Sequence, residues 1–120
     1  MVHYIVMVWA KAGHEAQVAQ FYQGLEPALR AAQGYRGRQI LRARHGALAH
    51  EVLKAGPPKE AGHGGHAQPE GVQFVVVEQW DSVDDRMAFS RAASGNRGRD
   101  LFPYILPEHS HEFYEDVTTA

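Results

Sequence analysis

The sequence predicts an α+β fold: a ferredoxin-like βαββαβ chain whose antiparallel sheet carries two helices on one face. The first observation is the order of elements, which reads strand, helix, strand, strand, helix, strand. The second is the distribution of apolar residues. The two most apolar strands are the first and the third, which this topology places at the sheet centre, whereas the two alternating strands fall at the edges.

Composition limits the classes of protein that the chain can represent. Its 120 residues suit one domain spanning 1–120, and 44% of them are hydrophobic, as in a globular protein. A net charge of −2 gives no indication of a nucleic-acid-binding protein, which would carry a basic surface. No apolar run reaches the ~20 residues that a bilayer crossing needs, so we expect no membrane partner. The chain has no cysteine and no recognisable signal peptide, and a cytoplasmic location is expected.

The third predicted strand, residues 72–80, organises the rest of the chain. Its apolar block at 74–77 lacks polar alternation, which indicates that both faces are covered. Asp81 or Ser82 then provides a helix cap, and Asp84 and Asp85 suit the positive end of the helix dipole. A buried strand therefore runs directly into a helix.

The first strand and first helix follow the same logic. Residues 2–9 form an apolar strand that ends at Lys11-Ala12-Gly13, and a helix begins near His14. Pro27 predicts a kink near 24–27, and Gly34 ends the helix. One apolar stripe faces the sheet, made of Val18, Tyr22, Leu25, Leu29 and Ala32.

The second strand and the segment after it differ in character. Residues 35–44 alternate, with Arg36, Arg38, Arg42 and Arg44 predicted on one face, as solvated edge residues or as a site for an anionic substrate. Residues 45–71 form a predicted loop insertion rich in glycine, proline and histidine, in which 47–54 forms a short helix or an extra strand.

The C-terminal third supplies a helix, an apolar connector and the last strand. The helix is expected from Val83 to about residue 93, although its apolar residues form no single stripe. Residues 100–106 are an aromatic connector, and residues 109–117 alternate as an edge strand. Because helices cover one face of such a sheet, the apolar central strands also predict a homodimer that packs sheet to sheet.

These features together resemble the dimeric α+β barrel superfamily and, within it, the antibiotic-biosynthesis monooxygenase-like family. The matching residues are the first strand with Lys11-Ala12-Gly13, the Gly34-Tyr35 entry to the second strand, and the third-strand ending Glu78-Gln79-Trp80-Asp81-Ser82. The resemblance implies a ligand cleft between each sheet and its helices. It does not select the chemistry, because the superfamily includes cofactor-free oxygenases, haem-degrading enzymes, isomerases and proteins without known activity.

The candidate site residues carry several interpretations. Trp80 is either a core aromatic or a cleft wall, and Glu78 on its face requires a partner such as an arginine from another element. Tyr104, Phe102 and Trp9 complete the predicted substrate-binding set. His109 and His111 emerge on one face within roughly 7 Å, as exposed edge residues, as metal ligands with Glu115, His45 or His50, or as the base of a proton transfer.

The function predicted is a homodimeric, cofactor-independent monooxygenase that oxidises a small hydrophobic aromatic or quinol-type substrate, with His109 or His111 as base and no resident metal or cofactor. The alternative is a non-catalytic ligand- or metal-binding barrel of stress-response type. Haem degradation fits less well. Haem-degrading relatives use an asparagine on the first strand and a histidine after the second helix, whereas residues 6–9 here are Val-Met-Val-Trp and no histidine lies between Arg91 and Glu108.

Overall fold

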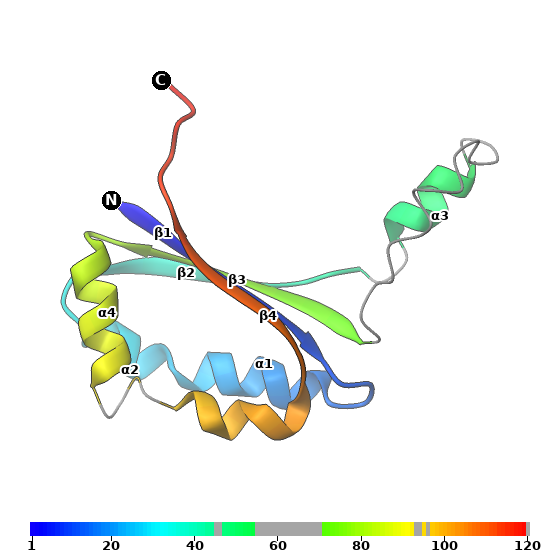
Figure 1. Ribbon diagram of the computed structural model, residues 1–120, viewed down its shortest axis with the longest axis horizontal. Coiled ribbons are helices and arrows are strands. Elements are labelled where there is room, and N and C mark those ends of the chain that lie inside the picture. The colour runs from blue at the N-terminus through cyan, green and yellow to red at the C-terminus, as the bar shows by residue number, and fades with distance from the viewer. Residues whose placement is uncertain (45–46, 55–70, 93–94, 96, 120) are drawn as a thin grey trace.

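The computed structural model describes residues 1–44, 47–54, 71–92, 95 and 97–119, and it has the predicted architecture. The elements in order are β1 (Val2–Ala10), α1 (Glu15–Gly24), α2 (Glu26–Arg30), β2 (Tyr35–Arg42), α3 (Ala47–Lys54), β3 (Val72–Trp80), α4 (Val83–Arg91), the 3₁₀ helix η2 (Gly98–Tyr104) and β4 (Ile105–Tyr114). Figure 1 shows α1, α2, α4 and η2 on one side of the sheet, with α3 projecting away from it.

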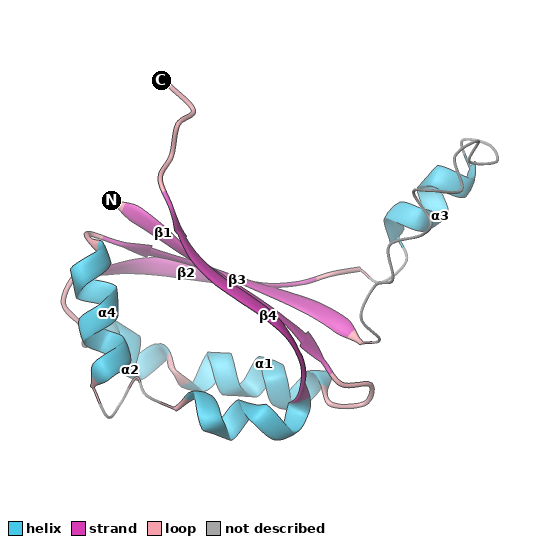
Figure 2. Cartoon of the chain, viewed as in Figure 1, coloured by secondary structure: helices cyan, strands magenta, loops and turns pink. Residues whose placement is uncertain are grey.

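The strand order is β2-β3-β1-β4, with every neighbouring pair antiparallel, so the prediction of β1 and β3 as central strands is confirmed. Figure 2 shows the sheet as a single twisted layer. None of the helices within the described residues has the length and apolar character that crossing a membrane would demand.

The two faces of the sheet differ in burial. Val6, Val8 and Val76 are at most 3% exposed and face the helices. Their neighbours Ile5 and Val77, which pair with each other across β1 and β3, point to the other side and are only half-buried. One chain therefore covers one face of its sheet, which we call the helix side, and leaves an open face made of Ile5, Met7, Trp9, Leu41, Val75 and Val77.

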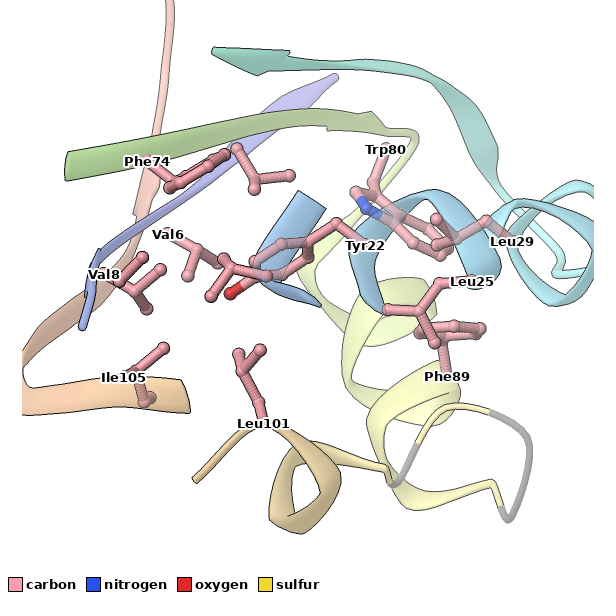
Figure 3. Packing of buried hydrophobic residues seen from close by; sticks show 13 residues of the cluster. Val6, Val8, Tyr22, Leu25, Leu29, Phe74, Trp80, Phe89, Leu101 and Ile105 are labelled. Atoms are coloured by element: carbon pink, nitrogen blue, oxygen red, sulfur yellow. The ribbon is translucent and has the colours of Figure 1, made fainter. Parts of the chain in front are cut away.

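The first predicted helix is interrupted where Pro27 indicated. It forms α1 and α2, separated at Leu25, and Pro27 lies in the first turn of α2, where its missing amide hydrogen costs no helical bond. Figure 3 shows Val6, Val8 and Phe74 on the sheet above Tyr22, Leu101 and Ile105 in the resulting core.

The predicted row of arginines on β2 is wrong in detail. A shift of register between Tyr35 and Gly37 places Tyr35 and Arg38 on the same face, because the bulge removes one step of the alternation. The side chain of Arg38 is buried, and its Nη2 pairs with Glu26 Oε2 at 3.1 Å, whereas Arg36 pairs with Asp81 at the surface. The row is therefore not one anion-binding surface.

The start of the last strand differs from the sequence prediction, and most of the predicted loop insertion lies outside the described residues. The last strand begins at Ile105, four residues before the predicted start. Residues 47–54 form a helix, one of the two predicted alternatives, while 45–46 and 55–70 of the predicted loop insertion lie outside the described residues, together with His45.

A pair of glycine substitutions tests how tightly α4 approaches the turn between α2 and β2, which contains Gly34. Gly13 and Gly34 both have left-handed φ values, 83° and 85°, but a side chain at Gly13 meets open space whereas one at Gly34 collides with Asp85 of α4. Gly13→Ala should cost about 1–2 kcal/mol of unfolding free energy from backbone strain alone. Gly34→Ala should cost more, measured by urea denaturation of both variants. Equal losses would contradict the close approach.

Candidate functional site

Four polar or aromatic side chains from four elements meet on the helix side of the sheet. They are Tyr4 of β1, Glu78 of β3, Arg86 of α4 and His111 of β4. The strand register brings them together. Tyr4 pairs with Glu78 of β3 and with Phe113 of β4, and His111 pairs with Val6, the next residue of β1 on the same face as Tyr4. Residues directly opposite in antiparallel strands share a face.

Glu78 anchors this cluster. It is 3% exposed, and its Oε1 accepts hydrogen bonds from Trp80 Nε1 at 2.8 Å and from Arg86 Nε at 2.7 Å. Arg86 also donates to the Ser90 hydroxyl one turn along α4. A carboxylate buried on a strand is stable only with such partners, and an arginine from another element is the partner that the sequence predicted.

Arg86 and Tyr4 connect this ion pair to β4. The guanidinium carbon of Arg86 lies 4.2 Å from the centroid of the Tyr4 ring, a cation–π contact. The Tyr4 hydroxyl lies 2.9 Å from Nδ1 of His111. Burial raises the pKa of Tyr4, partly offset by the Arg86 charge, so its hydroxyl keeps its proton at neutral pH.

The two predicted histidines do lie together. The rings of His109 and His111 are 5.4 Å apart, edge to face, on the helix side of β4, where both residues remain exposed. Partial desolvation is the main cause that lowers the pKa of His111, and the neighbouring His109 and Arg86 lower it further. The surroundings of His111 thus favour its uncharged imidazole. Among the described residues, no three histidine, aspartate or glutamate side chains gather as a metal site would require.

The predicted substrate-binding residues do not gather in the same way. Trp80 is 0% exposed, packed between Tyr35 and Phe89, so in this conformation it offers no surface to a ligand.

The other three predicted residues lie far from Trp80 or on the other face. Trp9 follows the buried Val8 and therefore lies on the open face. Phe102 is 62% exposed on η2, and Tyr104 stacks on His14, at the opposite end of β1 from Trp80.

The sequence analysis missed Tyr4, Arg86 and Phe113 as members of the site. Tyr4 and Phe113 pack ring to ring, with centroids 4.8 Å apart, beside His111. One signal was available for Tyr4, because it shares the strand parity of Val6 and Val8 and so belongs to the same face. Arg86 had no local signal beyond the need of Glu78 for a partner.

A separate hollow of about 400 Å³ lies between α2 and α4, away from the histidines. Its walls are mostly alanine, namely Ala28, Ala31, Ala32, Ala88 and Ala92, together with Gln33, Asp85 and Phe89. Asp85 is the charged residue on these walls, and neither histidine of β4 lies there to act with it. The histidine cluster is the better candidate site.

Solved structures share this fold across almost the whole chain. A "putative antibiotic biosynthesis monooxygenase" from Nitrosomonas europaea matches with a TM-score of 0.68 at 11% identity, over 98% of this chain and 91% of that one. One of the same description from Caulobacter crescentus matches with a TM-score of 0.68 at 14% identity, over 97% and 89%. A protein of unknown function, also from N. europaea, matches with a TM-score of 0.63 at 16% identity, over 99% and 91%.

No protein-family model and no curated protein sequence matches the chain. The structural similarity confirms the predicted fold, a ferredoxin-like α+β chain with a four-stranded antiparallel sheet. At these identities the similarity concerns the fold, and the chemistry has to be argued from the side chains.

Removing the Glu78 carboxylate tests whether the ion pair holds the cluster. Glu78→Ala should lower the unfolding free energy by about 3–5 kcal/mol, because it leaves Arg86 buried without its partner. Glu78→Gln, which keeps an acceptor for Trp80, should cost less. Asp81→Ala removes an exposed carboxylate that pairs with Arg36 and serves as control, with no resolvable change expected in urea denaturation. A Glu78→Ala protein as stable as this control would refute the role.

Proposed function

We propose that the protein is a cofactor-independent monooxygenase that oxidises a small, hydrophobic aromatic substrate of the phenol or quinol type. The observation that carries the proposal is the pair of imidazoles, His109 and His111, exposed beside the Tyr4 and Phe113 rings and the Arg86 cation. The fold shared with structures described as antibiotic biosynthesis monooxygenases supports it. A cytoplasmic location stays a prediction.

The proposed chemistry needs one base and a site that accepts a flat ring. An uncharged imidazole removes the proton of the substrate hydroxyl, and the phenolate transfers an electron to O₂. Combination of the ring radical with superoxide at a ring carbon bearing hydrogen gives a peroxide. Loss of water then leaves a quinone, so one oxygen atom enters the product and the other enters water. All four electrons come from the substrate, and no added reductant is required.

The substrate position in this proposal is the helix side of β4, next to the two histidines. Tyr4 and Phe113 offer aromatic surface for stacking. Arg86 lies behind Tyr4, where its charge favours an anion over a neutral phenol. The proposal thus uses residues that the sheet register brings together, while the substrate set predicted from the sequence stays a prediction.

We also propose that the open face packs against the same face of a second copy. The middle of that face is an apolar surface formed by Ile5, Met7, Val75 and Val77. The family that the sequence resembles is also one of dimeric barrels. Burial of such a surface contributes about 25 cal/mol per Å². Identical faces can pair through a two-fold axis without leaving a further surface unpaired.

Oxygen consumption tests the activity. Purified protein incubated with a panel of hydroquinones and polycyclic phenols should take up O₂ with at least one of them. The double variant His109→Ala, His111→Ala should lose 10²-fold or more of the rate, because base catalysis typically contributes 10²–10⁴-fold. Ser110→Ala is the matched control, since Ser110 lies between the histidines and points to the other face. Uptake that is equal in the double variant would refute the assignment.

Light scattering tests the dimer. At micromolar concentration the protein should have twice the mass of the 13.3 kDa chain. Val75→Asp places a charge in the middle of the open face and should give a monomer. Gln79→Asp lies on the same face of β3 but near its exposed end, and it should remain a dimer. A monomeric parent protein would end this proposal while leaving the oxidation assay valid.

A further inference from the structure

The contact between Tyr4 and His111 selects one nitrogen of the imidazole. The phenolic oxygen lies 2.9 Å from Nδ1, and Nε2 is left for other partners. A neutral imidazole carries its proton on one nitrogen only, so whichever group donates in this hydrogen bond determines what Nε2 can do. If Tyr4 donates, Nε2 carries hydrogen and is a donor. If Tyr4 accepts, Nε2 is a base.

The surroundings favour Tyr4 as the donor. A phenol gives up hydrogen to a hydrogen bond more readily than a neutral imidazole does, and the unprotonated imidazole nitrogen is the stronger acceptor. The Arg86 guanidinium, 4.2 Å from the Tyr4 ring centroid, opposes positive charge on the adjacent imidazole. Within the described residues, the Tyr4 hydroxyl has no other hydrogen-bond partner to receive its proton.

We infer that Tyr4 is a positioning residue that holds His111 in the Nε2–H form, so that His111 donates a hydrogen bond to the substrate oxygen while His109 is the base. This inference rests on the proposed function and assigns a different role to each of the two histidines. The substrate hydroxyl loses its proton to His109, whose ring stands 5.4 Å from that of His111. The phenolate oxygen that results accepts a hydrogen bond from Nε2–H of His111, and no covalent bond to His111 breaks.

The assignment of His111 as the neutral donor and His109 as the base agrees with the electrostatic surroundings of His111. Among the described residues, partial burial disfavours the imidazolium form of His111 most, His109 of β4 and Arg86 of α4 disfavour it further, and Glu78 of β3 favours it. Tyr4 also disfavours the imidazolium, because a hydrogen bond donated to the neutral form stabilises that form. A lowered pKa means that His111 stays neutral to more acidic pH, which suits a permanent donor that takes up no proton during turnover.

The decisive experiment is a long-range ¹⁵N–¹H correlation spectrum of the full chain labelled at histidine, which reports the protonation of each ring nitrogen. His111 should show hydrogen on Nε2 and none on Nδ1, with a titration midpoint below the ordinary value of about 6.5. Tyr4→Phe keeps the ring against Arg86 and Phe113 but removes the hydroxyl. It should introduce the Nδ1–H form and move the midpoint upward. Tyr114→Phe, on the opposite face, is the control and should change neither.

A spectrum with hydrogen on Nδ1 of His111 in the parent protein would overturn the inference, since Tyr4 would then accept and His111 would be the base. An unchanged His111 midpoint in Tyr4→Phe would overturn it as well. Both results are independent of activity, so they separate this inference from a failure of the proposed function.

The kinetic arm uses whichever hydroquinone supports oxygen uptake. His109→Ala should lose the acid limb of the pH–rate profile and recover rate with added imidazole. His111→Ala should keep the acid limb and lose about 10²–10³-fold in kcat, as when one donor to an oxyanion is removed. Imidazole rescue of His111→Ala alone would reverse the two roles and contradict the assignment.

Discussion

The buried carboxylate of Glu78 is the constraint on which the helix side of the sheet depends. A charge at 3% exposure requires donors, and it finds two, from Trp80 two residues along the same strand and from Arg86 on the following helix. These bonds orient the indole in the core and fix α4 against β3. Arg86 is consequently held over the Tyr4 ring, and Tyr4 in turn reaches His111. One ion pair therefore sets the positions of residues on three strands and a helix.

The same sheet explains why this network is not sealed inside the protein. The helices lie beneath the central strands, so Val6, Val8 and Val76 are buried, while the edge strand β4 remains largely uncovered. The network starts at a fully buried carboxylate and ends at two exposed imidazoles. Its buried end holds fixed charges with matched partners. Its exposed end carries two imidazoles that a ligand can reach.

Local sequence patterns were sufficient for the parts of the fold that depend on period and apolarity. The strand order followed from the apolar character of residues 2–9 and 74–77, and the helix break followed from Pro27. The shared face of His109 and His111 followed from the two-residue repeat of a strand. The bulge near Arg36 had no such signal, because a single inserted residue in a register depends on the partner strand. Tyr4 and Arg86 meet only through tertiary packing, so no spacing in the sequence connects them.

Trp80 is a residue whose structural position could be predicted from the sequence while two functional roles stayed open. Its position at a strand end before a helix cap fits both a core aromatic and a cleft wall, and both readings place it on the helix side. The hydrogen bond from its indole to Glu78 favours the core role, because a side chain bonded to a buried acceptor and packed on Phe89 has no exposed surface in this structure. Its part in any reaction is then indirect: it helps to hold the carboxylate that positions Arg86. In the proposed function, ligand contact falls instead to the rings beside β4, where burial is incomplete and aromatic surface and imidazoles occur together.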